Sequence, residues 1–397
     1  MANVSSSNGL ENRPKLRFPG FDEPYTCCRI GDIYEERSQR GASDMKLLSV
    51  TMNDGVMLRS DIESKDNSSE DKSNYKVVQK GDMVYNSMRM WQGANGISPY
   101  NGIVSPAYTV LMPKQQINNY YFAAFFKTYK LINEFRKNSQ GMTSDTWNLK
   151  YPQIKRIKIC VPSIQEQDKI ADMICILDKR IALQEQLVKA LKKYKRGLLN
   201  KVFSKTDGKI YPTVYLSEVA DFLQGLTYSP SDVAKSGYLV LRSSNIQNGI
   251  LSFDDCVYVD KSIPENLQVK YADVIMCVRN GSKNLVGKSA LIPNDMPMTT
   301  WGAFMMIVRS KLNDTYIFHY LNSQMFFSQV FKDTGTATIN QITKGILNEC
   351  KLPLPPVEER RNISKMLSSF DAKIQNEERN IVALMEAKKA LLQQLFI

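Results

Sequence analysis

Two short stretches decide the fold of this chain: Val161-Pro162-Ser163-Ile164-Gln165-Glu166-Gln167 and Leu354-Pro355-Pro356-Val357-Glu358-Glu359-Arg360. They align at an offset of 193 residues. From Pro162 to Phe203, 13 of 42 residues are identical to the residue 193 positions later. Self-similarity at one fixed period indicates an internal repeat. The chain is therefore predicted to be a tandem duplication.

Each copy of the repeat is predicted to form one long helix. In the first copy, Ser163 and Glu166 make the Ser-x-x-Glu pattern that satisfies free backbone donors at a helix start. In the second, Pro356 replaces the serine, but Glu359 still favours the positive end of the helix dipole. Apolar residues then recur at alternating steps of four and three over about four to five heptads, which is typical of a coiled-coil seam.

Both copies place polar residues at the same two points of this seam. An antiparallel pairing in which residue i faces residue 572 − i brings Lys195 opposite Glu377 and Gln184 opposite Lys388. Polar seam residues often fix register and orientation. The predicted interface consists of Leu177, Ile181, Gln184, Val188, Leu191, Lys195, Leu198, Phe370, Ile374, Glu377, Ile381, Leu384, Lys388 and Leu391. The alternative is two separate helices, each packed on its own domain.

The rest of the chain predicts two related globular parts, since 397 residues exceed the roughly 250 to 300 that one core supports. Each part has a turn that feeds a strand (77–85 and 269–276), a polar loop with glycine (86–96 and 277–284), a second strand (102–111 and 301–308) and an apolar helix (120–135 and 316–331). The predicted fold class is α+β: two similar globular domains joined by two long helices that form an intramolecular antiparallel coiled coil with pseudo-twofold symmetry. The predicted boundaries are a disordered tail at 1–13, domains at 14–160 and 206–353, and helices at 161–205 and 354–397.

The charge of the chain favours an anionic partner. The formal net charge is +12, and between Lys150 and Lys209 there are 15 Lys and Arg against 6 Asp and Glu. Nucleic acid or an acidic subunit would suit this stretch, and a solvated helix face is the alternative. No apolar run approaches the roughly 18 to 20 residues that span a bilayer, and residues 1–13 lack a secretion signal. We expect a cytoplasmic chain without a membrane partner.

Several kinds of chemistry are not supported by the sequence. The seven cysteines are an odd number without a Cys-x-x-Cys pair, so neither a disulfide framework nor a zinc site is expected. The single histidine, His319, lies in an apolar stretch and is expected to be a packed helix residue. Gly287-Lys288-Ser289 ends like a phosphate-binding loop, but the preceding glycine is Gly281, one residue too early. We expect a turn between strands there, and no catalytic or metal-binding residue is predicted.

A recognition role remains. Loops that carry Arg, Lys, Asn and Gln beside aromatic residues suit hydrogen bonding to base edges and contact with phosphates. The candidates in the first part are Asn86, Arg89, Gln92 and Asn95. Those in the second part are Arg242, Asn245, Arg279, Asn280 and Lys283.

The chain resembles the specificity subunit of type I restriction-modification enzymes over nearly all of its length after residue 13. The resemblance rests on Pro14-Lys15-Leu16-Arg17-Phe18-Pro19-Gly20-Phe21, the stretch 102–108, the duplicated proline-then-acid helix starts, and Leu391-Leu392-Gln393-Gln394-Leu395-Phe396. It implies that each globular part is a target-recognition domain that reads one half of a split target in double-stranded DNA. It also implies that the helices set the gap and dock DNA methyltransferase (modification) subunits.

The resemblance further implies a non-catalytic chain that carries no cofactor of its own. S-adenosylmethionine would be used by the modification subunits, and ATP with Mg²⁺ by separate restriction/translocase subunits. Two other hypotheses stay open at this point. One is a P-loop-like nucleotide hydrolase that depends on Lys288, and the other is a nonspecific DNA-binding coiled-coil protein whose binding follows salt alone.

Overall fold

The computed structural model describes residues 13–40, 44–52, 54–63, 68–204, 211–332 and 341–396. The chain divides into two compact units, each of which is described by itself. Unit 1 comprises Met1–Gln184 with Asn380–Ile397, and unit 2 comprises Glu185–Arg379. The predicted disordered tail, apart from its last residue, lies outside the described residues. The predicted domain boundaries remain predictions.

Unit 1 is built on a four-stranded antiparallel sheet in the order β2-β9-β6-β7. In its central pair, Met83 lies opposite Leu111 and Asn86 opposite Tyr108. Three two-stranded pairs surround this sheet: β1 with β10, β3 with β4, and β5 with β8. The strands are β1 (Thr26–Arg29), β2 (Tyr34–Glu36), β3 (Leu48–Thr51), β4 (Gly55–Leu58), β5 (Lys76–Val78), β6 (Met83–Asn86), β7 (Asn95–Ile97), β8 (Gly102–Val104), β9 (Tyr108–Pro113) and β10 (Lys158–Val161). The helices of the globular part are α1 (Ile30–Ile33), α2 (Asn119–Phe125), α3 (Tyr129–Asn138) and α4 (Tyr151–Ile154), with 3-10 turns η1 (Arg59–Asp61) and η2 (Met90–Gln92).

Aromatic residues fill the core of unit 1. The Asn118 side chain caps α2 by accepting the N–H of Tyr121, and the buried side of α2 carries Phe122 and Phe125. The Phe396 ring, at the far end of the chain, stacks on Phe125 with centroids 5.1 Å apart. The C-terminus of the second long helix is thereby anchored in the core of unit 1.

One disulfide lies in unit 1, although no disulfide framework was expected from the odd number of cysteines. Cys27 in β1 and Cys160 in β10 lie directly opposite each other and are bonded. They are 133 residues apart in the sequence, so only the pairing of these two strands brings them together. The other five cysteines are free thiols.

Unit 2 repeats this architecture. Its sheet has the order β12-β21-β18-β19, in which Val274 lies opposite Val308 and Cys277 opposite Met305. In both units an initial strand (β1 or β11) is followed by a short helix (α1 or α6) and the first strand of the sheet (β2 or β12). The initial strand pairs with the last strand of the unit, β10 or β22. Unit 2 also has a second sheet, β13-β17-β14-β20, which has no four-stranded counterpart among the described residues of unit 1. The strands are β11 (Thr213–Tyr215), β12 (Ala220–Gln224), β13 (Val233–Ala234), β14 (Tyr238–Leu241), β15 (Ile246–Gln247), β16 (Ile250–Leu251), β17 (Tyr258–Val259), β18 (Val274–Cys277), β19 (Ser289–Leu291), β20 (Thr299–Trp301), β21 (Met305–Ser310) and β22 (Lys351–Pro353). The helices are α6 (Leu216–Val219), α7 (Tyr316–Leu321), α8 (Gln324–Val330) and α9 (Lys344–Glu349), with 3-10 turns η3 (Pro230–Asp232), η4 (Ser243–Asn245), η5 (Glu265–Leu267) and η6 (Lys283–Leu285).

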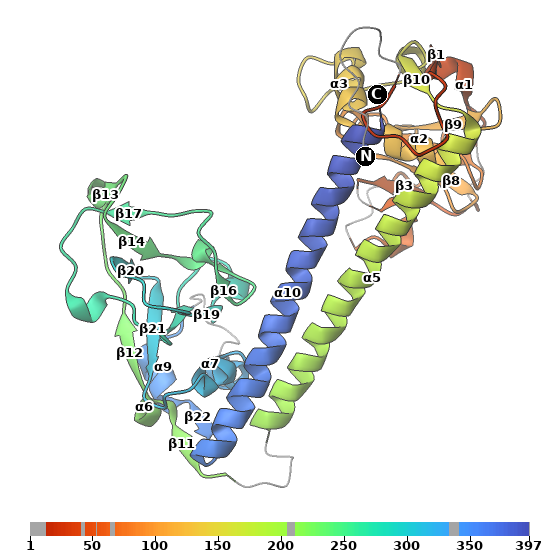
Figure 1. Ribbon diagram of the computed structural model, residues 1–397. Coiled ribbons are helices and arrows are strands. Elements are labelled where there is room, and N and C mark those ends of the chain that lie inside the picture. Colours follow the sequence, from red (N-terminus) through yellow and green to blue (C-terminus); the bar gives the residue numbers. More distant parts are fainter. Residues whose placement is uncertain are drawn as a thin grey trace. The chain divides into compact units, whose positions relative to one another are not determined.

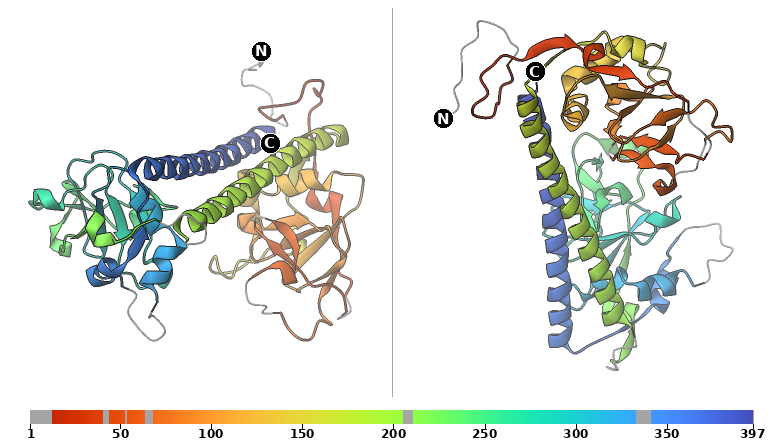
Figure 2. Two further views of the ribbon diagram at one scale, coloured as in Figure 1. Left: turned by 90° about the horizontal axis from the view of Figure 1, so that it is seen from below. Right: turned by 90° about the vertical axis from the view of Figure 1, so that its right-hand side faces the viewer.

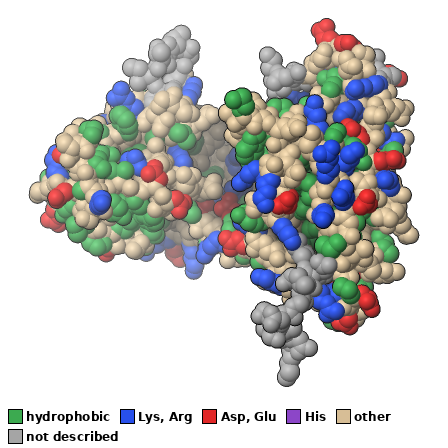
Figure 3. Space-filling model, turned by 90° about the horizontal axis from the view of Figure 1, so that it is seen from above, with side chains coloured by type: hydrophobic (Ala, Val, Ile, Leu, Met, Phe, Trp, Pro, Cys, Tyr) green, Lys and Arg blue, Asp and Glu red, His purple; other side chains and the backbone are tan. Residues whose placement is uncertain are grey.

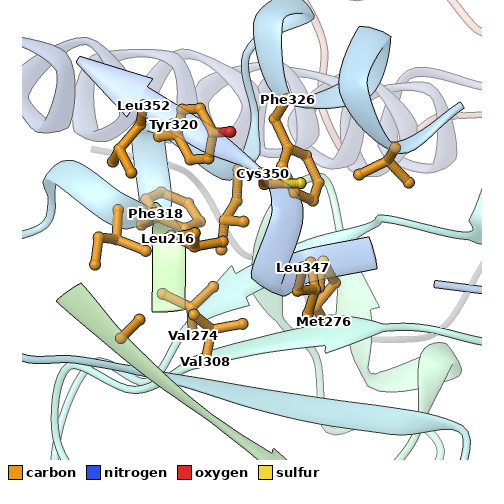
Figure 4. Close-up of a cluster of buried hydrophobic side chains, with 14 of the residues drawn as sticks. Leu216, Val274, Met276, Val308, Phe318, Tyr320, Phe326, Leu347, Cys350 and Leu352 are labelled. Carbon is orange, nitrogen blue, oxygen red and sulfur yellow. The ribbon is translucent and has the colours of Figure 1, made fainter. Parts of the chain in front are cut away.

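The core of unit 2 lies between its sheet and these helices. Figure 4 shows Val274, Met276 and Val308 of the sheet beneath Phe318 and Tyr320 of α7. All five side chains are buried. The burial of such side chains removes apolar surface from water and stabilises the packing of α7 on β18 and β21.

Two predicted elements in each unit are broken. The expected strands at 102–111 and 301–308 are each two strands separated by a turn, and the expected helices at 120–135 and 316–331 are each two helices. In unit 1 the helix break falls at Thr128, whose hydroxyl donates to the Phe125 carbonyl and closes α2. Apolar character continues through these breaks, so the pattern alone did not reveal them.

Two long helices, α5 (Ile164–Phe203) and α10 (Val357–Leu395), lie side by side (Figures 1 and 2). All fourteen predicted interface residues are buried or half-buried, whereas Leu183, outside the seam, is 65% exposed. Within unit 2, Lys195 pairs with Asp371 and Lys192 with Glu378, an order that shows antiparallel packing. The predicted coiled coil is confirmed. No helix among the described residues is both long and apolar enough to cross a bilayer.

The register of the helix pair differs from the predicted one. Lys195 pairs with Asp371, six residues before the predicted partner Glu377. In unit 1, Lys388 pairs with Asp178, six residues before Gln184. A shift of about one heptad again sets apolar seam positions against apolar seam positions, so the seam pattern cannot distinguish the two registers. The ion pairs of Asp371 and Asp178, which lie beside the seam, distinguish the observed register from the predicted one.

Candidate nucleic-acid interface

In unit 1, the loop after β6 borders a hollow of about 510 Å³. Asn86 and Arg89 both line this hollow. The Asn86 side chain accepts the N–H of Met88 at 3.0 Å, and its carbonyl accepts the N–H of Arg89 at 3.0 Å. These bonds fix the loop. Arg89 lines this hollow, and no hydrogen bond joins its guanidinium to another described residue.

The same hollow contains functional groups that the sequence analysis missed. Arg59 and Tyr75 line it, as does Tyr108, whose hydroxyl lies 3.1 Å from the Ser49 hydroxyl. Guanidinium, hydroxyl and amide groups on one concave wall suit hydrogen bonding to base edges and phosphates. These residues come from segments up to 59 positions apart, and only the folding of the β3-β4 pair beside the β6-β9 pair brings them together.

The other two candidates of unit 1 do not join this group. Asn95 is fully buried in β7, donates to the Gly93 carbonyl at 3.1 Å, and lines a different hollow of about 320 Å³ beside Lys127. Gln92 is half-buried at the end of η2. Next to it, the Trp91 ring lies beneath the Arg136 guanidinium at 5.8 Å. The structure thus brings Asn86 and Arg89 together and places Asn95 elsewhere.

In unit 2, the loop after β18 carries Arg279, Asn280 and Lys283. The Arg279 guanidinium carbon lies 5.4 Å from the ring centroid of Phe304, a residue absent from the predicted set. The Asn280 side chain accepts the N–H of Ser282 at 2.9 Å and lies 3.4 Å from the Ser243 hydroxyl. This contact joins the loop after β18 to the loop that contains Arg242.

The candidates in the loop after β14 are partly committed to the fold. The buried Asn245 amide accepts the Arg242 N–H at 2.9 Å and donates to the carbonyls of Ser252 and Asp255, both at 3.0 Å. Arg242 forms a salt bridge with Asp255 at 2.8 Å. Asn245 therefore shapes the loop, while Arg279, Asn280 and Lys283 present polar groups to solvent.

The segment that resembles a phosphate-binding loop is a turn, as expected. The Gly287 N–H donates to the Cys277 carbonyl at 2.8 Å, and Lys288 is followed by strand β19 and not by a helix. Gly287 has φ of +86°, and a Cβ there would lie 2.6 Å from the Phe327 ring. Local packing thus accounts for the glycine, and the nucleotide hydrolase hypothesis has no support. Among the described residues, no group of three or more His, Cys, Asp or Glu could hold a metal ion.

A buried polar cluster joins the globular part of unit 2 to its helix pair. His319 in α7 is fully buried, and its Nε2 lies 3.1 Å from the Ser368 hydroxyl of α10. Its Nδ1 lies 3.9 Å from Asp371. Burial lowers the pKa of His319 to about 3, and nearby Lys195 acts in the same direction. Burial also raises the pKa of Asp371, although Lys195 opposes this rise. His319 is the packed helix residue that was expected.

Figure 3 shows exposed lysine and arginine side chains at several places on the surface that it draws, interspersed with Asp and Glu. The formal net charge of +12 is consistent with this surface. Such a surface attracts the phosphates of nucleic acid independently of their sequence.

Comparison with known proteins gives concordant results. The family of the type I restriction modification DNA specificity domain matches residues 23–193 and again residues 211–386. The chain is similar to the type I restriction enzyme MjaVIII specificity subunit of Methanocaldococcus jannaschii, with 24% identity over 80% of this chain and 79% of that one. It is also similar to the EcoKI specificity subunit of Escherichia coli K12, with 28% identity over 40% of this chain. That match spans only 36% of the EcoKI chain.

Solved structures share the fold. The type I restriction-modification S subunit of M. genitalium is matched over 97% of this chain and 99% of that chain, with a TM-score of 0.59 and 14% identity. A chain from a structure concerned with complex assembly and conformational transition of a type I R-M system is matched over 96% and 99%, with a TM-score of 0.59 and 17% identity. Each of these two structural matches covers both units and both long helices.

Proposed function

The chain belongs to the family of type I restriction-modification DNA specificity proteins, and we propose that each of its units reads one half of a split DNA target. Its function is that of the DNA specificity subunit of a type I restriction-modification system. The observation that carries the proposal is the repeated scaffold: both units have the same strand order and present a polar loop after the equivalent strand, β6 or β18.

We further propose that the helix pair acts as the spacer between the two reading sites and as the docking surface for modification subunits. The coiled-coil packing of α5 and α10 supports a stiff spacer, because buried seam residues repeat along both helices. About 40 residues at 1.5 Å each give a helix roughly 60 Å long. At 3.4 Å per base pair, such a length suits a target whose halves are separated by unread bases.

Catalysis is assigned to partner chains in this proposal. DNA methylation with S-adenosylmethionine would take place on the modification subunits. ATP- and Mg²⁺-dependent translocation and cleavage would take place on restriction/translocase subunits. The chain would work as a non-catalytic subunit in the cytoplasm, where prokaryotic DNA lies, and the residues described here would bind and orient double-stranded DNA.

Base-resolution methylation mapping of the host genome, with and without the gene, tests the function. A split motif with a fixed gap that disappears on deletion is the expected result. Nonspecific DNA binding predicts no such motif and binding that follows salt concentration alone.

Single substitutions then assign the halves to the units. If Arg89 and Arg279 each read a guanine, Arg89→Ala should relax one half-site and Arg279→Ala the other, by about 1 to 3 kcal/mol each. Lys311→Ala is a suitable control, because Lys311 pairs with Asp221 at the opposite end of β21. An unchanged motif in either arginine variant would remove that residue from the reading site.

A further inference from the structure

The turn between β20 and β21 presents an exposed phenylalanine. The Met305 N–H donates to the Gly302 carbonyl at 2.8 Å, which closes a turn with Ala303 and Phe304 at its tip. The Phe304 carbonyl accepts the N–H groups of Val278 and Arg279 at 3.0 and 3.2 Å. The backbone of Phe304 is therefore fixed to the end of β18, while the residue remains 60% exposed.

The ring of Phe304 also orients a candidate base-reading residue. Arg279 lies over this ring, with 5.4 Å between the guanidinium carbon and the ring centroid. A cation–π contact of this kind restricts the guanidinium without using its N–H donors. No hydrogen bond joins those donors to another described residue, and an arginine can use them to bind the O6 and N7 atoms of a guanine together.

From this pairing we propose that Phe304 is a specificity-determining residue of unit 2, which contacts the methyl group of a thymine near the guanine bound by Arg279. The inference rests on the proposed function. Base pairs stack 3.4 Å apart, so a ring centred 5.4 Å from the guanidinium falls within one to two base-pair steps of that guanine. The thymine methyl is the apolar group of the major groove, and phenylalanine is one of the side chains that contact it.

Unit 1 shows that the scaffold does not itself require an aromatic residue at this position. In unit 1 Asn86 lies opposite Tyr108, and at the equivalent place in unit 2 Cys277 lies opposite Met305. The residue before Tyr108 is Ala107, which is therefore the counterpart of Phe304. The same backbone bond is present, because the Ser87 N–H donates to the Ala107 carbonyl at 3.1 Å. The turn closes equally with alanine. The exposed ring of unit 2 thus has no evident part in holding the turn, which favours a role toward DNA.

The test uses the full chain in complex with its modification subunits. After the wild-type motif is mapped, each thymine in the half-site that Arg279→Ala relaxes is replaced by deoxyuridine, which lacks only the methyl group. We expect one thymine, within two base pairs of the guanine, at which this change weakens binding of the wild type about fourfold, the contribution of one buried methylene-sized group. Phe304→Ala should abolish this sensitivity, and Phe304→Leu should retain part of it.

Two controls make the outcome decisive. Tyr271→Ala removes an aromatic residue of similar exposure, 64%, from the turn at the other end of β18, and it should keep the fourfold sensitivity. Each variant should keep its discrimination at the guanine bound by Arg279, which shows that unit 2 has folded, and its binding to the half-site of unit 1 should be unchanged. Equal sensitivity in Phe304→Ala and wild type, or no sensitive thymine near the guanine, would overturn the assignment. A methylome that does not depend on the gene would instead refute the proposed function.

Discussion

Acidification should destabilise unit 2 through its one histidine. His319 is fully buried, its Nε2 contacts the hydroxyls of Ser368 and Thr315 at 3.1 and 3.4 Å, and its pKa is lowered to about 3. In the unfolded chain its pKa is about 6.5. Between these two values the unfolded state binds more protons than the folded state, so stability falls as the pH decreases from about 6.5 toward 3. At pH 5 the loss amounts to about 2 kcal/mol.

The assay compares wild type with His319→Gln in urea unfolding at pH 7 and pH 5, and follows the transition of unit 2. The chain has a single histidine, so the substitution removes all imidazole titration. We expect wild type to lose about 2 kcal/mol more than the variant between the two pH values. Carboxylates titrate in both proteins. The raised pKa of Asp371, which acts in the opposite direction, is also present in both, so the difference reports His319.

Ser368→Ala serves as the matched control, because it removes a hydrogen-bond partner and leaves the imidazole in place. It should lower stability at both pH values and keep the extra loss at pH 5. The ¹³C-labelled imidazole gives an independent measurement by NMR: its resonance in the folded protein should not titrate between pH 8 and pH 5. Equal pH dependence of wild type and His319→Gln would refute the burial argument.

Other predictions concern the helix pair. In a double-mutant cycle, Lys195→Ala and Asp371→Ala should show a coupling energy of about 1 kcal/mol, since both groups are largely shielded from solvent. Additive losses of stability from the two substitutions would contradict the observed register. Leu367→Ala should cost about 3 kcal/mol in urea unfolding because this side chain is fully buried, whereas Leu183→Ala, at a position 65% exposed, should change stability by less than about 0.5 kcal/mol. One heptad inserted at equivalent points of both helices adds roughly 10 Å, which should widen the gap of the methylated motif by about three base pairs. An unchanged gap would show that the helices do not set the spacing.

The helices could be predicted from the sequence in detail, except for their register. The four-three spacing placed every seam residue correctly, because burial along a coiled coil depends on local periodicity. The choice between registers depends on pairs such as Lys195 with Asp371, which lie outside the apolar pattern and far apart in the chain. The disulfide between Cys27 and Cys160 escaped prediction for the same reason, since only a strand pairing unites its ends.

The reading site was only partly accessible to sequence reasoning. The polar loops after β6 and β18 were found because polar residues and glycine follow an apolar strand. Phe304 was missed because it lies inside an apolar run that was predicted as one strand, whereas Gly302 begins a turn there. Asn245 was included because its residue type suits adenine, although its amide is fully used within its own loop.

The two units share a backbone arrangement but not the side chains that it presents, and this bears on the form of the DNA target. In each unit a buried aspartate before the central strand is bound by an arginine fork: Asp82 by Arg37 and Asp273 by Arg309. Arg37 follows β2 whereas Arg309 lies in β21, so the equivalent aspartates are bound from different strands. Equivalent carbonyls fix the turn beside the reading loop. At that turn, however, unit 1 has Ala107 beside an open hollow and unit 2 has an exposed aromatic ring. A palindromic target would require two equal reading surfaces, so we expect the mapped motif to have unlike halves. Identical inverted halves would show that these side chains do not contribute to recognition.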